Sequence, residues 1–156
     1  MAIISKNKRG SFDYEILERF RAGIVLKGYE VKSIKNGRVS LQGSFVVLRQ
    51  SEKGKLPEVF LIGATIPPYQ PKNTPPDYLP QRSRKLLLKK SEIKTLVGKS
   101  KQKGLTMIPL MVYTQKGKIK LEFGIAKGKR KIDKREIIKK RETEKEMKRA
   151  LSEKFQ

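Results

Sequence analysis

Prolines gather in one short segment of this chain, and they set the strongest limit on where regular structure can form. Six of the eight prolines lie within residues 67–80, in the segment PPYQPKNTPPDYLP. Proline has a fixed φ and no amide hydrogen, so this segment cannot donate the hydrogen bonds of a regular helix or a central strand. We therefore expect an exposed loop, with the helices and strands of the chain before and after it.

Short apolar runs bounded by glycine indicate regular structure before the loop. The run AGIVL, residues 22–26, is expected to be a strand, whereas residues 12–21 fit either a strand or a helix. Over residues 28–37 the spacing of Val31 and Ile34 predicts a short helix that turns both side chains inward.

A second helix is expected after the loop. Ser91 is a suitable cap for a helix that places Ile93, Leu96 and Val97 on one face, and Gly104 stands where a left-handed terminator is wanted. We expect this helix to cover one end of a sheet.

Four further runs have the pattern of β-strands. Residues 45–49 and 58–66 form an expected hairpin, and the runs 106–114 and 118–125 predict two more strands joined by a QKG turn. Several short strands with a helix or two, in so small and basic a chain, favour a mainly β fold. We expect an antiparallel barrel of about six strands, similar to the oligonucleotide-binding type.

The charge of the chain indicates its partner. Lys and Arg number 38 against 15 Asp and Glu, which leaves +23 and favours nucleic acid over any other partner. Membrane binding is disfavoured because the basic segments lack a wide apolar face. A cytoplasmic location is expected, since the N-terminal segment does not have the pattern of a secretion signal and the chain has no cysteine.

Most enzyme chemistry is disfavoured by the residue types present. The chain has neither His nor Cys, so it lacks an imidazole base, a thiolate nucleophile and the usual zinc ligands. The GKS at 98–100 resembles the end of a phosphate-binding loop, but Ile93 stands where that motif needs glycine. Scattered acids give little support to a metal-dependent nuclease. We expect no enzymatic activity, no cofactor, no metal and no small-molecule substrate.

The two ends of the chain differ from its middle. Residues 1–11 are polar and basic and are predicted to be a flexible leader, before a barrel over 12–126. Residues 127–156 hold 13 basic and 6 acidic side chains. Their apolar stripe of Met147, Leu151 and Phe155 is too narrow to hold a helix in water, so we expect a tail that is disordered alone and helical on a partner.

Several side chains in basic surroundings leave two interpretations open. The run QRSRKLLLKK, residues 81–90, is either a set of phosphate contacts or a solvated charge run. Glu30 is able to cap a helix or to accept hydrogen bonds from base amino groups, with the first slightly favoured. Tyr14, Tyr29, Tyr69 and Tyr78 fit either base stacking or ordinary packing.

Four blocks of sequence together resemble the small protein B family, in the family's order: GYEVKSIKNGR, RSRKLLLKKSEI, KGLTMIPL and GIAKGKRKIDKRE. The resemblance runs from about Phe12 to the end. It implies a six-stranded barrel with three helices that binds the tRNA-like domain of transfer-messenger RNA (tmRNA) near its D loop. It also implies delivery of tmRNA to stalled ribosomes for trans-translation, with the tail entering the empty mRNA channel beyond the decoding centre.

The resemblance also implies roles for single residues. The expected RNA contacts, including the outer face of the first helix, are Glu30, Lys32, Lys35, Arg38, Arg82, Arg84, Lys85, Gly124, Lys127, Gly128 and Lys129. The expected ribosome contacts of the tail are Lys131, Asp133, Lys134, Arg135, Lys139, Lys140 and Arg141. One copy of the protein is expected per RNA.

Two positions depart from the family pattern. Phe12 stands where many members have His, which leaves a ring for stacking but nothing to protonate. Leu79 replaces part of a usual Asp-Pro pair before Arg82. The alternative that composition allows is a structural ribosomal protein or a nonspecific RNA-binding protein.

Overall fold

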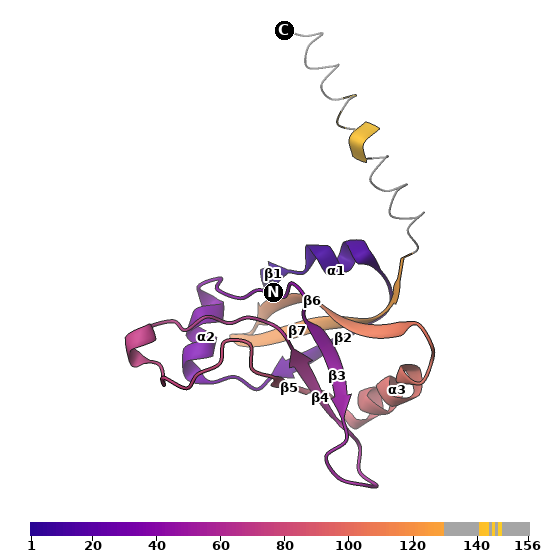
Figure 1. Ribbon diagram of the computed structural model, residues 1–156, viewed down its shortest axis with the longest axis horizontal. Coiled ribbons are helices and arrows are strands. Elements are labelled where there is room, and N and C mark those ends of the chain that lie inside the picture. Colours follow the sequence, from indigo (N-terminus) through magenta and orange to yellow (C-terminus); the bar gives the residue numbers. More distant parts are fainter. Residues whose placement is uncertain (130–140, 144, 146, 148–156) are drawn as a thin grey trace.

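A computed structural model describes residues 1–129, 141–143, 145 and 147 of the chain (Figure 1). This part contains an antiparallel sheet and a few short helices. The strands are β1 (Ala2–Lys6), β2 (Tyr14–Ile24), β3 (Phe45–Arg49), β4 (Glu58–Ile62), β5 (Arg84–Leu87), β6 (Leu105–Gln115) and β7 (Lys118–Gly128). The helices are α1 (Lys8–Asp13), α2 (Gly28–Lys35) and α3 (Lys90–Ser100), with a single 3₁₀ turn, η1 (Pro71–Asn73).

Six of the strands close into a ring. Antiparallel pairings connect β6 to β3, β3 to β4, β4 to β5, β5 to β2, β2 to β7 and β7 back to β6. The prediction of a mainly β fold with a six-stranded antiparallel barrel and about three helices is therefore confirmed. The weakest link is between β3 and β6, where the register holds one pair, Val46 with Met107.

Residues 1–11 were expected to be a flexible leader, and most of them lie in regular structure. Residues 2–6 form β1, which pairs with the second half of β6, and α1 follows directly. The Asn7 side chain fixes this corner: it accepts a hydrogen bond from the Gly10 amide at 3.0 Å and donates one to the Pro109 carbonyl oxygen at 2.8 Å. After the irregularity between Pro109 and Met111, one edge of β6 pairs with β7. The backbone groups on its other edge pair with β1.

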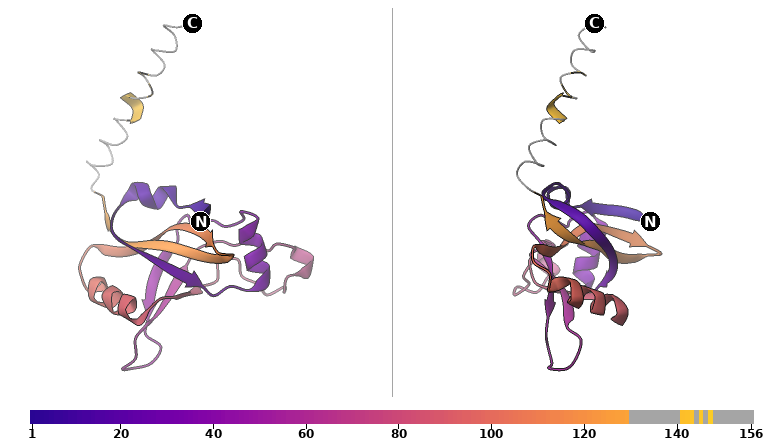
Figure 2. Two further views of the ribbon diagram at one scale, coloured as in Figure 1. Left: turned by 180° about the vertical axis from the view of Figure 1, so that it is seen from behind. Right: turned by 90° about the vertical axis from the view of Figure 1, so that its right-hand side faces the viewer.

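The core fills the inside of the ring. Phe20 of β2 and Phe123 of β7 stack at 5.5 Å between ring centroids, and Leu96 of α3 is completely buried. Figure 2 shows α1 and α3 on opposite sides of the body. Ile34 of α2 is buried as predicted, whereas Val31 is half-buried. Figure 1 shows α2 and α3 at different ends of the body.

Turns and helix ends largely follow the sequence pattern. The turn between β6 and β7 has positive φ at both Lys116 and Gly117, as a two-residue hairpin requires. The second helix is confirmed, but its first turn is capped by Glu92, whose carboxylate accepts a hydrogen bond from the Lys89 amide at 3.1 Å. Ser91 is therefore inside the helix. Residues 12–21 contain the end of α1 and the first part of β2.

The proline-rich segment is an exposed loop, as predicted, with only the short η1 turn inside it. It lies next to α2 at one end of the molecule (Figure 1). A hydrogen bond joins the two ends of the segment: the Ile66 amide donates to the Pro80 carbonyl oxygen at 3.0 Å. None of the helices in the described ranges is long and apolar enough to cross a membrane.

Candidate nucleic-acid interface

Glu30 is a fully buried carboxylate in the first turn of α2. Its Oε1 accepts a hydrogen bond from the Lys27 amide at 2.9 Å, which caps the helix. The side chain of Arg82 donates to both carboxylate oxygens of Glu30, and the Tyr78 hydroxyl lies 3.1 Å from Glu30 Oε2. Arg84 completes the set, with Nε at 2.8 Å and Nη2 at 2.6 Å from Oε2.

Arg84 ties together three parts of the chain. Besides Glu30, its guanidinium donates to the carbonyl oxygens of Ala64 at 2.9 Å, Arg82 at 3.0 Å and Pro80 at 2.8 Å. A buried guanidinium is tolerated only when its donors are satisfied, and here they are. Arg84 therefore holds α2, the segment after β4 and the end of the proline-rich loop in one arrangement.

The buried cluster keeps Glu30 ionised. Burial alone would raise the pKa of Glu30, but hydrogen bonds from Arg82, the Lys27 amide and Arg84, with the charge of Arg84, lower that pKa below its ordinary value. The same burial raises the pKa of Tyr78, and the neighbouring negative charge of Glu30 adds to the effect. Glu30, Tyr78, Arg82 and Arg84 are called the Glu30 cluster below.

Glu30 and Arg84 were predicted to contact RNA, and the structure places both inside the body; their contact with RNA stays a prediction. Both side chains have no exposed surface, because each is enclosed by the partners it binds. Glu30 takes the capping role that chemistry favoured. Arg82 keeps a quarter of its side chain exposed, so it alone of the three remains available to a ligand.

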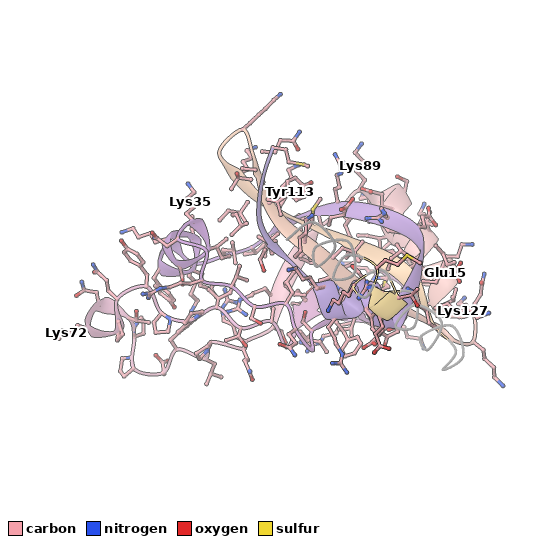
Figure 3. All side chains as sticks on the ribbon, turned by 90° about the horizontal axis from the view of Figure 1, so that it is seen from above. Glu15, Lys35, Lys72, Lys89, Tyr113 and Lys127 are labelled. Atoms are coloured by element: carbon pink, nitrogen blue, oxygen red, sulfur yellow. The ribbon has the colours of Figure 1, made fainter. Side chains whose placement is uncertain are left out.

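Exposed cations lie around this cluster. Lys32, Lys35 and Arg38 are all exposed on or just after α2. Lys72, from the proline-rich loop, lies at the same end of the molecule as Lys35 (Figure 3). Within the described ranges, no salt bridge joins any of these four side chains to a carboxylate, so their charge faces solvent and suits phosphate. This set is called the α2 surface.

Lys85 is turned away from the Glu30 cluster. It follows Arg84 in β5, and alternation along the strand places it on the outer side, exposed, with Nζ 3.7 Å from the Glu58 carboxylate. The structure therefore separates two neighbouring members of the predicted RNA-contact set.

The predicted contacts at the end of β7 form a separate group. Lys127 lies at the opposite end of the molecule from Lys35 and Lys72 (Figure 3), and both Lys127 and Gly128 are exposed. The Lys129 amide donates a hydrogen bond to the Asp13 carbonyl oxygen at 3.0 Å. Because β7 reaches Gly128, the ordered body continues two residues beyond its predicted end.

Gly124, another predicted RNA contact, also lies inside the body. It is buried, and a Cβ atom there would lie 2.8 Å from Ile16 Cγ2 and 3.0 Å from the Glu18 carbonyl oxygen. The glycine allows β2 and β7 to approach closely, so its role is packing.

A basic hollow lies between α1 and the rim of β6 and β7. Its lining includes Lys6, Lys8, Phe12, Arg19, Glu122, Lys129 and Arg141. The Arg141 guanidinium lies 5.4 Å from the centroid of the Phe12 ring. Arg141 is the only predicted ribosome contact of the tail within the described ranges; Lys131, Asp133, Lys134, Arg135, Lys139 and Lys140 lie outside them.

Sequence reasoning left the role of Tyr78 open and missed that Arg84 is internal. Tyr78 donates from its hydroxyl toward the Ile66 carbonyl oxygen at 2.7 Å, and Tyr29 packs edge-on against its ring at 4.9 Å between centroids. One signal was present in the sequence. Glu30 is a single acid in a basic patch, and a buried acid requires a cationic partner, which Arg82 and Arg84 could supply.

Leu79, the second departure from the family pattern, is 68% exposed, and its carbonyl oxygen accepts a hydrogen bond from the Arg82 amide at 3.1 Å.

Comparisons with known proteins agree with this architecture. The family model described as SmpB protein matches residues 4–153. An SsrA-binding protein of Cupriavidus necator is 47% identical over 148 residues, or 95% of each chain. An SsrA-binding protein of Geobacillus kaustophilus is 47% identical over 151 residues, covering 97% of this chain and 93% of the relative.

Structural similarity points the same way. A solved chain described under "tmRNA-SmpB: a journey to the center of the bacterial ribosome" superposes with a TM-score of 0.64 and 43% identity, over 86% of this chain and 93% of the other. Since the family model covers nearly the whole chain and the two relatives match it over 95% and 93% of their own length, this chain belongs to the SmpB family.

Proposed function

We propose that this chain is a non-enzymatic RNA adapter that binds the tRNA-like domain of tmRNA and delivers it to stalled ribosomes in the cytoplasm for trans-translation. Family membership carries the proposal: the relatives are named SsrA-binding proteins, and the structural neighbour is described as tmRNA-SmpB at the centre of the bacterial ribosome. Among the described residues, no group of His, Cys, Asp and Glu is placed to hold a metal ion.

The Glu30 cluster supports RNA binding indirectly. It fixes the proline-rich loop against α2, so the backbone positions that carry the cations of the α2 surface are set before RNA arrives. Preorganised cations lose less side-chain and loop entropy on binding than mobile ones do. Lys32, Lys35, Arg38 and Arg82 are the proposed phosphate contacts.

Lys127, Gly128 and Lys129 at the end of β7 stay proposed RNA contacts. Lys127 lies at the opposite end of the molecule from Lys35 and Lys72 (Figure 3), so these contacts are separate from the α2 surface. The tail begins at the end of β7, and Lys131, Asp133, Lys134, Arg135, Lys139, Lys140 and Arg141 are its proposed ribosome contacts. An intact message would occupy the channel that the tail needs, so the tail reports an empty channel.

A gel-shift comparison tests the adapter against a nonspecific RNA-binding protein. We expect the full-length protein to bind the tRNA-like domain at least tenfold more tightly than a duplex of equal length at about 150 mM salt. Equal affinity for both RNAs would reject the adapter and favour the nonspecific alternative.

The division of labour has its own test. Changing Lys134 and Arg135 together to Ala is expected to leave RNA binding within twofold of the parent and to abolish tagging on stalled ribosomes. The matched control changes Lys32 and Lys35 to Ala, which should weaken RNA binding directly. Loss of RNA binding in both double variants alike would show that the two jobs are not separable.

A further inference from the structure

The outer side of β3, β4 and β5 is a surface that the proposed function does not use, although Lys85 on it was predicted from the sequence to contact RNA. The register places Phe45 opposite Ile62, and Phe60 between Val47 and Lys85. The residues that alternate with them, Val46, Val59, Leu61 and Leu86, are buried in the core, so this row of side chains points outward. Phe45 is 38% exposed.

Arg49 is held on this surface by an aromatic ring. Its guanidinium carbon lies 4.8 Å from the centroid of Phe60, and Nη2 donates a hydrogen bond to Ser83 Oγ at 3.2 Å. In the part of the chain that the structure describes, Arg49 takes part in no salt bridge. A guanidinium held over a ring by a cation–π contact and anchored by one hydrogen bond keeps its charge, and Arg49 is exposed to solvent.

Phe45 and Phe60 are diagonal neighbours across β3 and β4, close enough to serve adjacent groups of one ligand. With Arg49 they form what we call the Phe60 face: two rings and one guanidinium plane on rigid strands. The loop 50–57 extends from the end of β3 and β4 (Figure 1) and adds exposed Lys53 and Lys55.

The charge beside the Phe60 face is positive. Arg49, Lys53, Lys55 and Lys85 stand against Glu52 and Glu58, a difference of 4 − 2, or +2. Lys55 is paired with Glu52 at 2.8 Å and Lys85 with Glu58 at 3.7 Å, which leaves Arg49 and Lys53 unpaired among the described residues. An acidic protein would use the cations but would leave both rings exposed. A nucleic acid duplex would leave the rings equally unused, because its bases are already stacked.

We propose that the Phe60 face binds unpaired nucleotides of RNA. A base stacks on the exposed Phe45 ring, next to the Arg49 guanidinium that covers Phe60, and a flanking phosphate contacts Lys53. Stacking on aromatic side chains beside a basic track is how barrels of this kind hold single strands without reading sequence. This inference does not rest on which structured RNA binds the α2 surface.

Fluorescence anisotropy of the full-length protein with a fluorescein-labelled 12-nucleotide single-stranded RNA tests the proposal. Phe45→Leu keeps an apolar side chain and removes the stacking surface. We expect about tenfold weaker binding of the single strand, the size of effect that losing one base–aromatic stack implies, with duplex binding unchanged within twofold. The matched control, Leu79→Ala, removes an exposed apolar side chain from the proline-rich loop and should change neither affinity.

Unchanged single-strand affinity in Phe45→Leu would overturn the proposal, and so would an equal loss for single strand and duplex. Polyglutamate added as a competitor gives a second readout. If polyglutamate displaces the single-stranded RNA equally well from the parent and from Phe45→Leu, the Phe45 ring adds nothing to binding. The Phe60 face then recognises charge alone, and the proposal fails. Thermal unfolding of the variant, expected within about 3 °C of the parent, excludes a folding defect.

Discussion

Arg84 and Glu30 form a fully buried ion pair, with two guanidinium nitrogens 2.8 Å and 2.6 Å from one carboxylate oxygen. The pair joins the start of α2 to the start of β5, which are 54 positions apart in sequence. Through the carbonyl oxygens of Ala64 and Pro80, the same guanidinium also fixes the two sides of the proline-rich loop. A charge pair of this kind specifies one arrangement of the loop, and the α2 surface depends on it.

Breaking the pair should cost much of the stability of the fold. Arg84→Met leaves Glu30 with fewer partners in a buried site, and we expect a loss of about 3–5 kcal/mol in the free energy of unfolding. Urea denaturation followed by circular dichroism measures it. The matched control is Lys85→Met, the exposed neighbour on the outer side of β5, which should change stability by less than about 1 kcal/mol. A loss below about 1 kcal/mol in Arg84→Met would contradict the structural role.

Stability should also fall in acid through Glu30. The pKa of Glu30 is lowered in the folded protein, so its contribution is complete above the ordinary value of 4.5 and is lost as pH falls toward the folded pKa. We expect the unfolding free energy of the parent to drop more steeply below about pH 4.5 than that of Glu30→Gln. Urea midpoints measured between pH 3 and pH 7 give both slopes. Parallel slopes would mean that Glu30 is not held ionised by the cluster.

The α2 surface should contribute phosphate contacts that are independent of the fold. Lys32→Ala and Lys35→Ala are each expected to lower the salt dependence of RNA binding by about one unit of slope, without a change in stability. Kd measured from 50 to 300 mM salt gives the slope. Lys94→Ala, an exposed lysine of α3 away from this surface, is the control and should leave the slope unchanged. A drop of equal size in the control would show a general charge effect only.

Gly124 and Gly98 provide a matched pair for the packing argument. At Gly124 an added Cβ meets Ile16 and the Glu18 backbone, so Gly124→Ala should destabilise the protein by about 1–3 kcal/mol. At Gly98, inside α3, the same atom meets open space, so Gly98→Ala should stabilise by about 0.5–1 kcal/mol. Thermal unfolding of both variants shows whether stability falls at Gly124 and rises at Gly98. Unchanged stability in Gly124→Ala would contradict the close packing of β2 against β7.

Much of the fold follows from local pattern, because alternation and glycine spacing are properties of neighbouring residues. The alternation of Ile119, Leu121 and Phe123 in β7 and the helical spacing of α2 are examples, and both are confirmed. β1 was not predicted, since five residues beside a charge run carry little pattern, and the partner of β1 is β6, more than a hundred positions away in sequence.

The candidate site was predicted less well, and for a related reason. Composition cannot tell which of Arg82, Arg84 and Lys85 turns inward, because that depends on the register of β5 against β4 and β2. The three leucines that follow show the same limit: Leu86 is buried and Leu87 is exposed. Residues expected to touch RNA therefore divide into a buried support and an exposed surface, and only the structure separates them.

The most direct measurement of the central claim is to sequence the RNA that co-purifies with the full-length protein from bacterial cells. If the α2 surface selects one folded RNA, tmRNA should dominate the bound fraction far beyond its share of cellular RNA, and the Lys32 and Lys35 double alanine variant should lose it. A bound fraction that mirrors the abundance of ribosomal and transfer RNA would contradict the account.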